Sequence, residues 1–271
     1  MSLYSQGGGF NVVKTVHATG LPLETDNYYD DIVLGNVPNN SALIKFGRNQ
    51  DVSSTGEDIW NGGGVYTGQP ASYTPELVTV VSSSVDDAAA GTGARTVRIE
   101  GLKTSTSTVY ETEDITLNGT TPVDSVDTWW RVNRAYVLTA GSGGANAGTL
   151  TCAAKVTTSN VFMVMPVGVN QTAIAAWTVP YGSQAIIKTI GFAGGRTTGT
   201  TIANAGLFTR TQGGVYRRRH TLTAGNGVSA VRQFVTGLLC AAGDDIKMRV
   251  TSASANSGDF LGYFEILNLK S

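Results

Sequence analysis

The chain has 271 residues with a formal net charge of −1, and 14% of its residues are charged. A chain of this length can bury a sizeable core, and we expect it to form two domains. Because a nearly neutral chain has no overall field to attract nucleic acid or anionic lipid, we expect neither nucleic acid nor a membrane as a partner. The 34 glycines, with abundant Thr, Ser, Ala and Val, are typical of sheets packed inside an assembly.

Residues 1–70 are predicted to form an extended arm and a glycine-rich docking segment. Up to residue 45, single apolar side chains separated by Gly, Pro and Asn can lie along another surface but cannot build a core; a disordered leader is the alternative. Residues 46–66 combine three consecutive glycines with Trp60, which indicates a loop held by one large aromatic side chain. We find no signal-peptide pattern and no run of about 20 apolar residues, so we expect a soluble protein made in a cytoplasm.

Residues 71–160 are predicted to form a first antiparallel β module. Apolar residues recur with a period of two, and Asn118-Gly119 is a strong turn signal. We expect Val97, Ile99 and Leu102 to face the core of this module. The predicted strands cover residues 76–81, 95–102, 107–117, 128–138 and 149–156.

Residues 161–271 are predicted to form a jelly-roll-like β-sandwich, with the module boundary near residues 157–170. Residues 160–168 fit a strand that connects the modules, and Ile246, Met248 and Val250 share one face of a late strand. The other predicted strands cover residues 173–179, 185–192, 205–210, 215–222, 231–239 and 260–269. The fold class is therefore all-β: an extended N-terminal arm followed by two antiparallel β-sandwich modules.

We expect no catalytic, cofactor-binding or metal site, and hence no enzyme. His17 and His220 are the only histidines, and no nucleophile elbow or phosphate-binding loop occurs. The acidic pairs, such as Asp86 and Asp87, are expected in solvated turns. Cys152 and Cys240 lie in apolar segments, which favours buried free thiols over a disulfide.

Two short motifs suggest protein interfaces. In a regular strand Arg217 and Arg219 share one face, while Arg218 and His220 share the other with Tyr216. Splitting the charge in this way favours ion pairs with a carboxylate-bearing neighbour or with another subunit over a nucleic-acid groove. In the second motif, Trp129 and Trp130 lie on opposite faces of a strand, so one is expected in the core and the other, if exposed, at a subunit contact or sugar platform.

One stretch resembles a segment found in structural proteins of tailed bacteriophage virions. It reads KFGRNQDV at residues 45–52 and EDIWNGGGVY at residues 57–66, and the family pattern is Phe-Gly-x-Asn-x-Asp followed by Glu-Asp-x-Trp-x-Gly-Gly. The sequences GTGARTV at 91–97, LNGTTPV at 117–123 and RVNRA at 131–135 are similar to the same group. The resemblance covers roughly residues 43–170.

This resemblance implies a virion component, most specifically a capsid decoration (cement) protein that binds the major capsid protein and stabilises the head. It also implies self-association, with a homotrimer as the expected state. The alternative is a head or tail fibre protein whose C-terminal domain binds host-surface glycan, with Tyr181, Tyr216 and Tyr263 as stacking candidates. The interface candidates are Phe46, Arg48, Trp60, Tyr66, Trp129, Trp130, Arg217 and Arg219.

Overall fold

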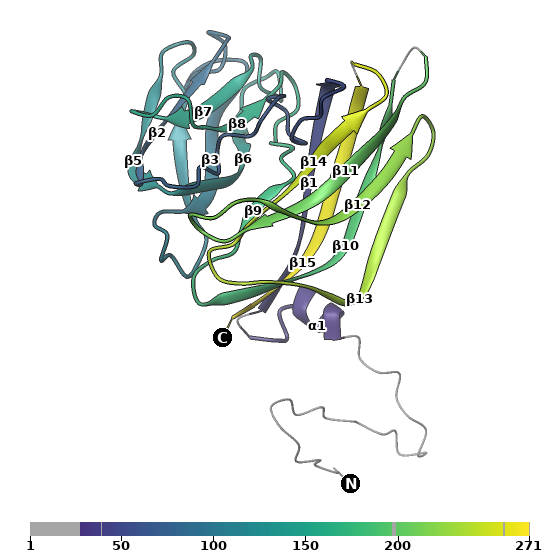
Figure 1. Cartoon of the computed structure of the whole chain (residues 1–271). Coiled ribbons are helices and arrows are strands. Elements are labelled where there is room, and N and C mark those ends of the chain that lie inside the picture. Colours follow the sequence, from purple (N-terminus) through teal and green to yellow (C-terminus); the bar gives the residue numbers. More distant parts are fainter. Residues whose placement is uncertain (1–27, 39, 197–198, 257, 271) are drawn as a thin grey trace, which may run out of the picture. The chain divides into compact units, whose positions relative to one another are not determined.

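The computed structural model describes residues 28–38, 40–196, 199–256 and 258–270 (Figure 1). The chain divides into two units between Ala42 and Leu43, and each is described by itself. Most of the predicted extended arm, residues 1–27, lies outside the described residues. In the part that is described, Tyr28–Val33 forms the short helix α1 instead of an extended segment. Asp30 and Asp31 lie in its first turn, where carboxylates interact favourably with the helix dipole.

Eight strands, β1 among them, build a jelly roll. Its two four-stranded sheets have the orders β1-β15-β10-β13 and β12-β11-β14-β9. The first of the eight strands therefore neighbours the last, the second neighbours the seventh, the third the sixth and the fourth the fifth, which is the nested pairing of a jelly roll. The strands are β1 (Asn40–Val52), β9 (Ala176–Thr178), β10 (Ser183–Gly195), β11 (Ile202–Arg210), β12 (Arg217–Gly225), β13 (Ala230–Cys240), β14 (Asp245–Ala253) and β15 (Gly258–Lys270).

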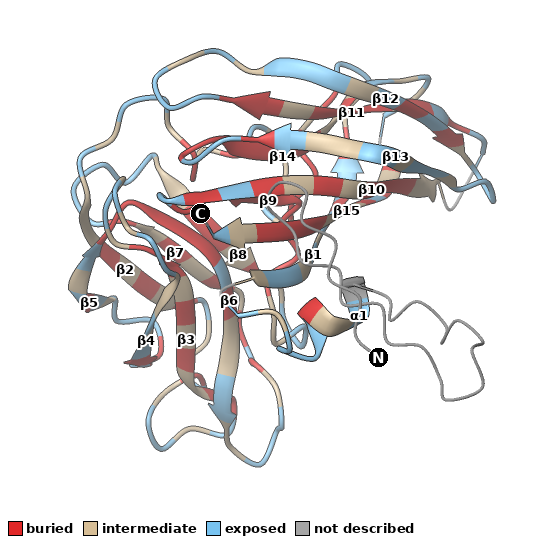
Figure 2. Cartoon of the chain, turned by 90° about the horizontal axis from the view of Figure 1, so that it is seen from below, coloured by how far each residue is buried: buried red, intermediate tan, exposed pale blue. Residues whose placement is uncertain are grey.

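A second β module is inserted between the first two strands of the jelly roll. It has one sheet of order β5-β2-β7-β8 and one of order β4-β3-β6, and Figure 2 labels the three strands of the latter side by side. Its strands are β2 (Glu76–Ser82), β3 (Ala94–Leu102), β4 (Glu111–Thr116), β5 (Val123–Trp129), β6 (Arg131–Ala140), β7 (Leu150–Ala154) and β8 (Val161–Met165). The chain thus leaves the jelly roll after β1 and returns to it at β9. We call this part the inserted module.

The all-β prediction is confirmed, and so is the alternation of several strands. Val97 and Ile99 are fully buried in the core of the inserted module, and Leu102 is also buried. Ile246 and Val250 are likewise buried in the jelly-roll core. Figure 2 shows buried and less buried positions following one another along strands such as β3 and β10, as a period of two requires. At the predicted turn, Gly119 has a φ of 61°, a conformation that favours glycine.

The predicted order of the parts is wrong in two places. Residues 40–52 were expected in an arm and docking loop, but they form β1, an end strand of a jelly-roll sheet beside β15. Residues 161–165 were assigned to the C-terminal sandwich, but they form β8 and pair with β7 of the inserted module. The first error arises because the partner of β1 lies more than 200 residues later in the chain and leaves no local pattern. The second is a module boundary placed one strand too early, since β8 follows β7 directly and pairs with it.

In the described part of the chain, no helix is long and apolar enough to cross a membrane. Nor do three His, Cys, Asp or Glu side chains gather there in a way that could hold a metal ion.

Cys152 and Cys240 are buried free thiols, as predicted. Asp87 departs from its prediction, because it is fully buried and accepts hydrogen bonds from the Ser82 hydroxyl and from backbone N–H groups.

Candidate interaction surface

Two extended segments lie between the two hydrophobic cores and line both of them: one contains Ile59 and Trp60, and the other contains Ile174 and Ala175. We call these two segments the wall. Ile59 packs in the jelly-roll core, whereas Trp60 packs in the core of the inserted module. The returning segment repeats this alternation, with Ile174 in the inserted module and Ala175 in the jelly roll. Successive side chains of an extended backbone point to opposite sides, so one stretch of chain can line two cores at once.

Backbone hydrogen bonds fix this wall to β14. The N–H of Ile59 donates to the Met248 carbonyl at 3.1 Å, and the N–H of Ala175 donates to the Ile59 carbonyl at 3.0 Å. Gly47 of β1 lies directly against them: a Cβ built there would be 2.1 Å from the Ile59 oxygen and 2.3 Å from the Ala175 nitrogen. Only glycine allows the strand to approach this closely.

The residues that carry the phage resemblance hold this wall in place. Asn49 donates from Nδ2 to Glu57 at 3.0 Å and to the Asp58 carbonyl at 3.1 Å. Glu57 also accepts from the N–H of Gly64, and Asp58 accepts from the N–H of Tyr66 at 2.7 Å. The predicted docking segment therefore joins the two modules of one chain to each other, and its large aromatic, Trp60, is buried within the chain.

Beside the wall lies a buried set of charges. Arg131 of the inserted module and Arg210 of the jelly roll both pair with Asp245, and Lys247 pairs with Asp58 at 2.7 Å. All five side chains are at most 7% exposed. Burial lowers the pKa of Lys247, which Asp58 partly offsets. Since buried charges are costly unless they are paired, these bonds specify how the two modules fit together.

Tyr216 lies just before β12 and packs against this buried set of charges. Its ring lies under the Arg210 guanidinium and the Lys247 ammonium, each 4.3 Å from the ring centre. Its hydroxyl donates to Gln69 at 2.8 Å, and burial raises its pKa. Tyr216 is therefore occupied within the chain, whereas Tyr181, another stacking candidate, is 54% exposed.

The eight interface candidates divide into two groups. Trp60, Tyr66, Trp129 and Trp130 are each at most 5% exposed. Both indoles of the Trp129-Trp130 pair are buried, so the condition for a subunit contact or sugar platform is not met. Trp129 packs in the core of the inserted module, and the Arg131 guanidinium lies 4.1 Å from the Trp130 ring. The exposed group consists of Phe46, Arg48, Arg217 and Arg219. Among these, Arg48 forms a two-bond ion pair with Asp259 on the neighbouring strand.

The arginines of β12 do not divide between faces as predicted. Leu207 pairs with His220 and Phe208 with Arg218, so a register shift leaves Arg219 as an extra residue. His220 turns inward and its ring meets that of Phe234 at 5.3 Å. A β-bulge of this kind interrupts the alternation of side chains between the two faces of a strand and changes their direction. The spacing of residues in the sequence does not indicate this bulge.

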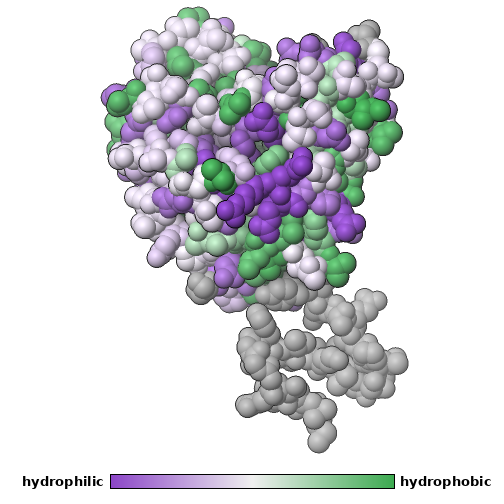
Figure 3. All heavy atoms as spheres, viewed as in Figure 1, coloured by the Kyte–Doolittle hydropathy of each residue, from purple (hydrophilic) through white to green (hydrophobic). Residues whose placement is uncertain are grey.

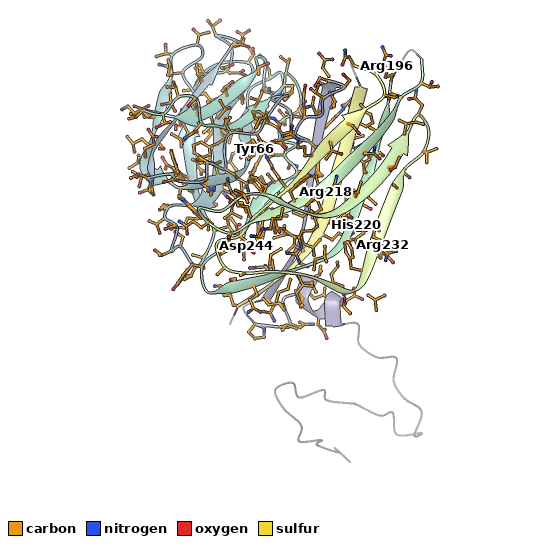
Figure 4. All side chains as sticks on the ribbon, in the orientation of Figure 1. Tyr66, Arg196, Arg218, His220, Arg232 and Asp244 are labelled. Carbon is orange, nitrogen blue, oxygen red and sulfur yellow. The ribbon has the colours of Figure 1, made fainter. Side chains whose placement is uncertain are left out.

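Several arginines lie at the free edge of the jelly roll. β12 and β13 are the end strands of the two sheets, on the side opposite β1 and β9. We define the arginine surface as Arg217, Arg218, Arg219 and Arg232, all of them exposed. Among the described residues, none of these four guanidinium groups takes part in an ion pair. Figure 4 labels Arg218, His220 and Arg232 on this side of the molecule.

Apolar side chains accompany the arginine surface. β13 exposes Val231 and Leu239, each 56% exposed, and Val235, which is 98% exposed. Figure 3 shows a hydrophilic band across the middle of the face that carries β12, with hydrophobic residues beside it. Arginine with exposed apolar side chains is a composition typical of protein interfaces. Arg219 also acts within the chain: burial raises the pKa of Asp244, and the charge of Arg219 partly offsets this.

The fold and this surface define an all-β protein with two modules and one free, positively charged edge. Comparison of the sequence with protein families and with curated proteins gives no match. Among solved structures, the chain has some likeness to infectious bursal disease virus particles. A structure of the Gx strain is 10% identical, with 85% of this chain and 72% of that chain covered and a TM-score of 0.23. A VP2 subviral particle of the same virus is 11% identical over the same shares, with a TM-score of 0.22. Likeness at these TM-scores carries no conclusion about this chain.

Proposed function

We propose that the protein is a structural component of a bacteriophage virion, and more specifically a capsid decoration protein that binds the major capsid protein and stabilises the head. The proposal includes no catalytic step. The single observation that carries it is the arginine surface: exposed guanidinium groups that form no ion pair with any described residue, next to exposed apolar side chains on β13. The sequence resemblance of residues 43–170 to phage virion proteins supplies the biological setting.

The charge of this edge specifies the kind of partner. Two copies of the arginine surface would repel each other, so this edge does not fit a symmetric contact between copies of the chain. An acidic surface on a different protein would pair with the guanidinium groups and cover the apolar side chains. The trimer that we also propose would therefore use another face, and the arginine edge would meet the capsid lattice.

A rigid body suits this role. The shared wall and the buried charges fix the inserted module to the jelly roll, so a contact made by one module holds the other in a defined place. Many moderate contacts repeated over a lattice then add through fixed geometry.

Copy number and position on the particle test the proposal. Quantitative mass spectrometry of purified virions should give hundreds of copies, and a particle reconstruction should place the β12–β13 edge against the capsid lattice. A few copies confined to the tail or neck would overturn the decoration role and favour the alternative, a fibre protein with a glycan-binding C-terminal domain.

A further inference from the structure

A cavity of about 330 Å³ lies where the jelly roll meets the inserted module. β1 provides Leu43, Lys45 and Phe46, and β9 provides Trp177. The inserted module contributes the charged residues Glu100 and Arg134, from β3 and β6. The walls are therefore largely apolar and aromatic, with a few charged groups, which is the usual composition of a small-molecule site.

Lys45 is the charged residue of this cavity for which the described residues provide no ion-pair partner. Its Nζ donates to the Asn133 carbonyl at 2.5 Å, which uses one of three N–H donors. In the described part of the chain, no carboxylate lies within ion-pair distance of it. Glu100 is already engaged, because its carboxylate pairs with Arg134 at 3.5 Å. A half-buried ammonium group thus faces the cavity with unused donors.

The groups around Lys45 leave its charge poorly compensated. Burial and the Arg134 guanidinium lower its pKa to about 8, while Glu100 raises it. The third neighbour, Tyr110, directs its hydroxyl to the Thr178 carbonyl and accepts from Asn133, so it adds no negative charge. At neutral pH the ammonium form still prevails, and an incoming anion would stabilise it.

We propose that this cavity binds a small organic acid, whose carboxylate pairs with Lys45 and whose apolar body packs against Leu43, Phe46 and Trp177. The volume suits such a molecule, since a cavity of about 150 Å³ holds benzene and twice that volume holds a ring with a carboxylate. A neutral molecule of the same shape would fill the apolar part but leave the ammonium without an anion. The site is independent of the arginine surface, which lies at the opposite edge of the jelly roll.

The test uses the full chain and two probes of nearly equal shape, 4-fluorobenzoate and 4-fluorobenzamide, followed by ¹⁹F NMR in a carboxylate-free buffer. We expect benzoate to bind at least about tenfold more tightly, as one charge-assisted hydrogen bond allows. Lys45→Met should remove this preference. Lys155→Met, which removes an ammonium that pairs with Asp124 on the inserted module, should retain it.

Equal affinity for the two probes, no binding of benzoate, or an unchanged preference in Lys45→Met would each overturn the proposal. Should Lys45→Met fail to fold, the wild-type chain provides a second measurement. Benzoate affinity should fall by up to about tenfold per pH unit above pH 8, as the ammonium loses its proton, while benzamide affinity stays constant. A benzoate affinity that does not change between pH 7 and pH 9.5 would exclude Lys45 as the binding group.

Discussion

Ile59 and Trp60 are consecutive in the chain, yet the first side chain is buried in the jelly-roll core and the second in the core of the inserted module. Two adjacent residues therefore connect the two hydrophobic cores. The insertion between β1 and β9 is not a flexible appendage, because the segments that leave and re-enter the jelly roll form the wall of both cores.

Trp60→Ala should weaken both modules together. Truncating a buried Trp costs about 3 to 5 kcal/mol, and the neighbouring wall transmits the loss to the jelly roll. We expect one cooperative urea transition at lower urea, followed equally well by probes in either module. Tyr181→Ala, which truncates an exposed aromatic, should leave the midpoint nearly unchanged. Two separate transitions in the wild-type chain would contradict the shared wall.

Removing the central carboxylate of the buried charges should be equally costly. Asp245→Asn leaves Arg131 and Arg210 buried without their anion, and breaking a buried pair in this way costs about 3 to 5 kcal/mol. Asp114→Asn is the matched control, because Asp114 pairs with Arg98 at the surface and should matter little. Chemical denaturation of the two variants compares them directly. Equal midpoints would show that the buried charges do not hold the modules together.

The stability of the chain should carry a pH signature of Lys45. Its pKa is about 8 in the folded chain, against 10.5 as the ordinary value. Between these two pH values the unfolded chain binds more protons at Lys45 than the folded chain does, so the free energy of unfolding rises with pH. Below pH 8 Lys45 is charged in both states, and burying its ammonium group destabilises the folded chain by the full amount. The advantage of Lys45→Met over the wild type in urea unfolding should therefore shrink from pH 7 to pH 9.5. A difference that stays constant or grows would contradict the lowered pKa.

Both thiols should be unreactive in the native chain. Burial raises the pKa of Cys152 and raises that of Cys240 to about 12, so neither forms a thiolate near neutral pH. A thiol reagent such as 5,5′-dithiobis(2-nitrobenzoate) should find no reactive group at pH 8 and two after unfolding in urea. Rapid reaction of one thiol in the folded chain would show that its strand opens locally.

Local sequence patterns predict the strands but not which strands pair. Alternation of apolar and polar residues predicts that Val97, Ile99, Ile246 and Val250 face a core, and all four are buried. By contrast, β1 lies beside β15, more than 200 residues later, and nothing in residues 40–52 indicates it. Trp60 illustrates the same limit. Its residue type predicts burial of a large aromatic surface, but whether that surface packs inside the chain or against another protein depends on the tertiary fold.

The arginine run was visible in the sequence, but its geometry was not. The bulge at Arg219 and the contribution of Arg232 from the opposite sheet arise only when β12 and β13 become the end strands of two facing sheets. The buried charges could not be foreseen either, since Asp58, Arg131 and Asp245 come from three distant segments, and each looks like an ordinary surface residue in its own sequence context.

The most direct test of the central claim, that the arginine surface attaches the protein to the head, is co-sedimentation with phage heads lacking it. Arg217→Ser combined with Arg218→Ser should weaken binding about tenfold or more and reduce its dependence on salt. The control, Arg98→Ser combined with Lys155→Ser, removes the same charge from ion-paired sites of the inserted module and should bind like the wild type. Equal binding of the two double variants would contradict the claim.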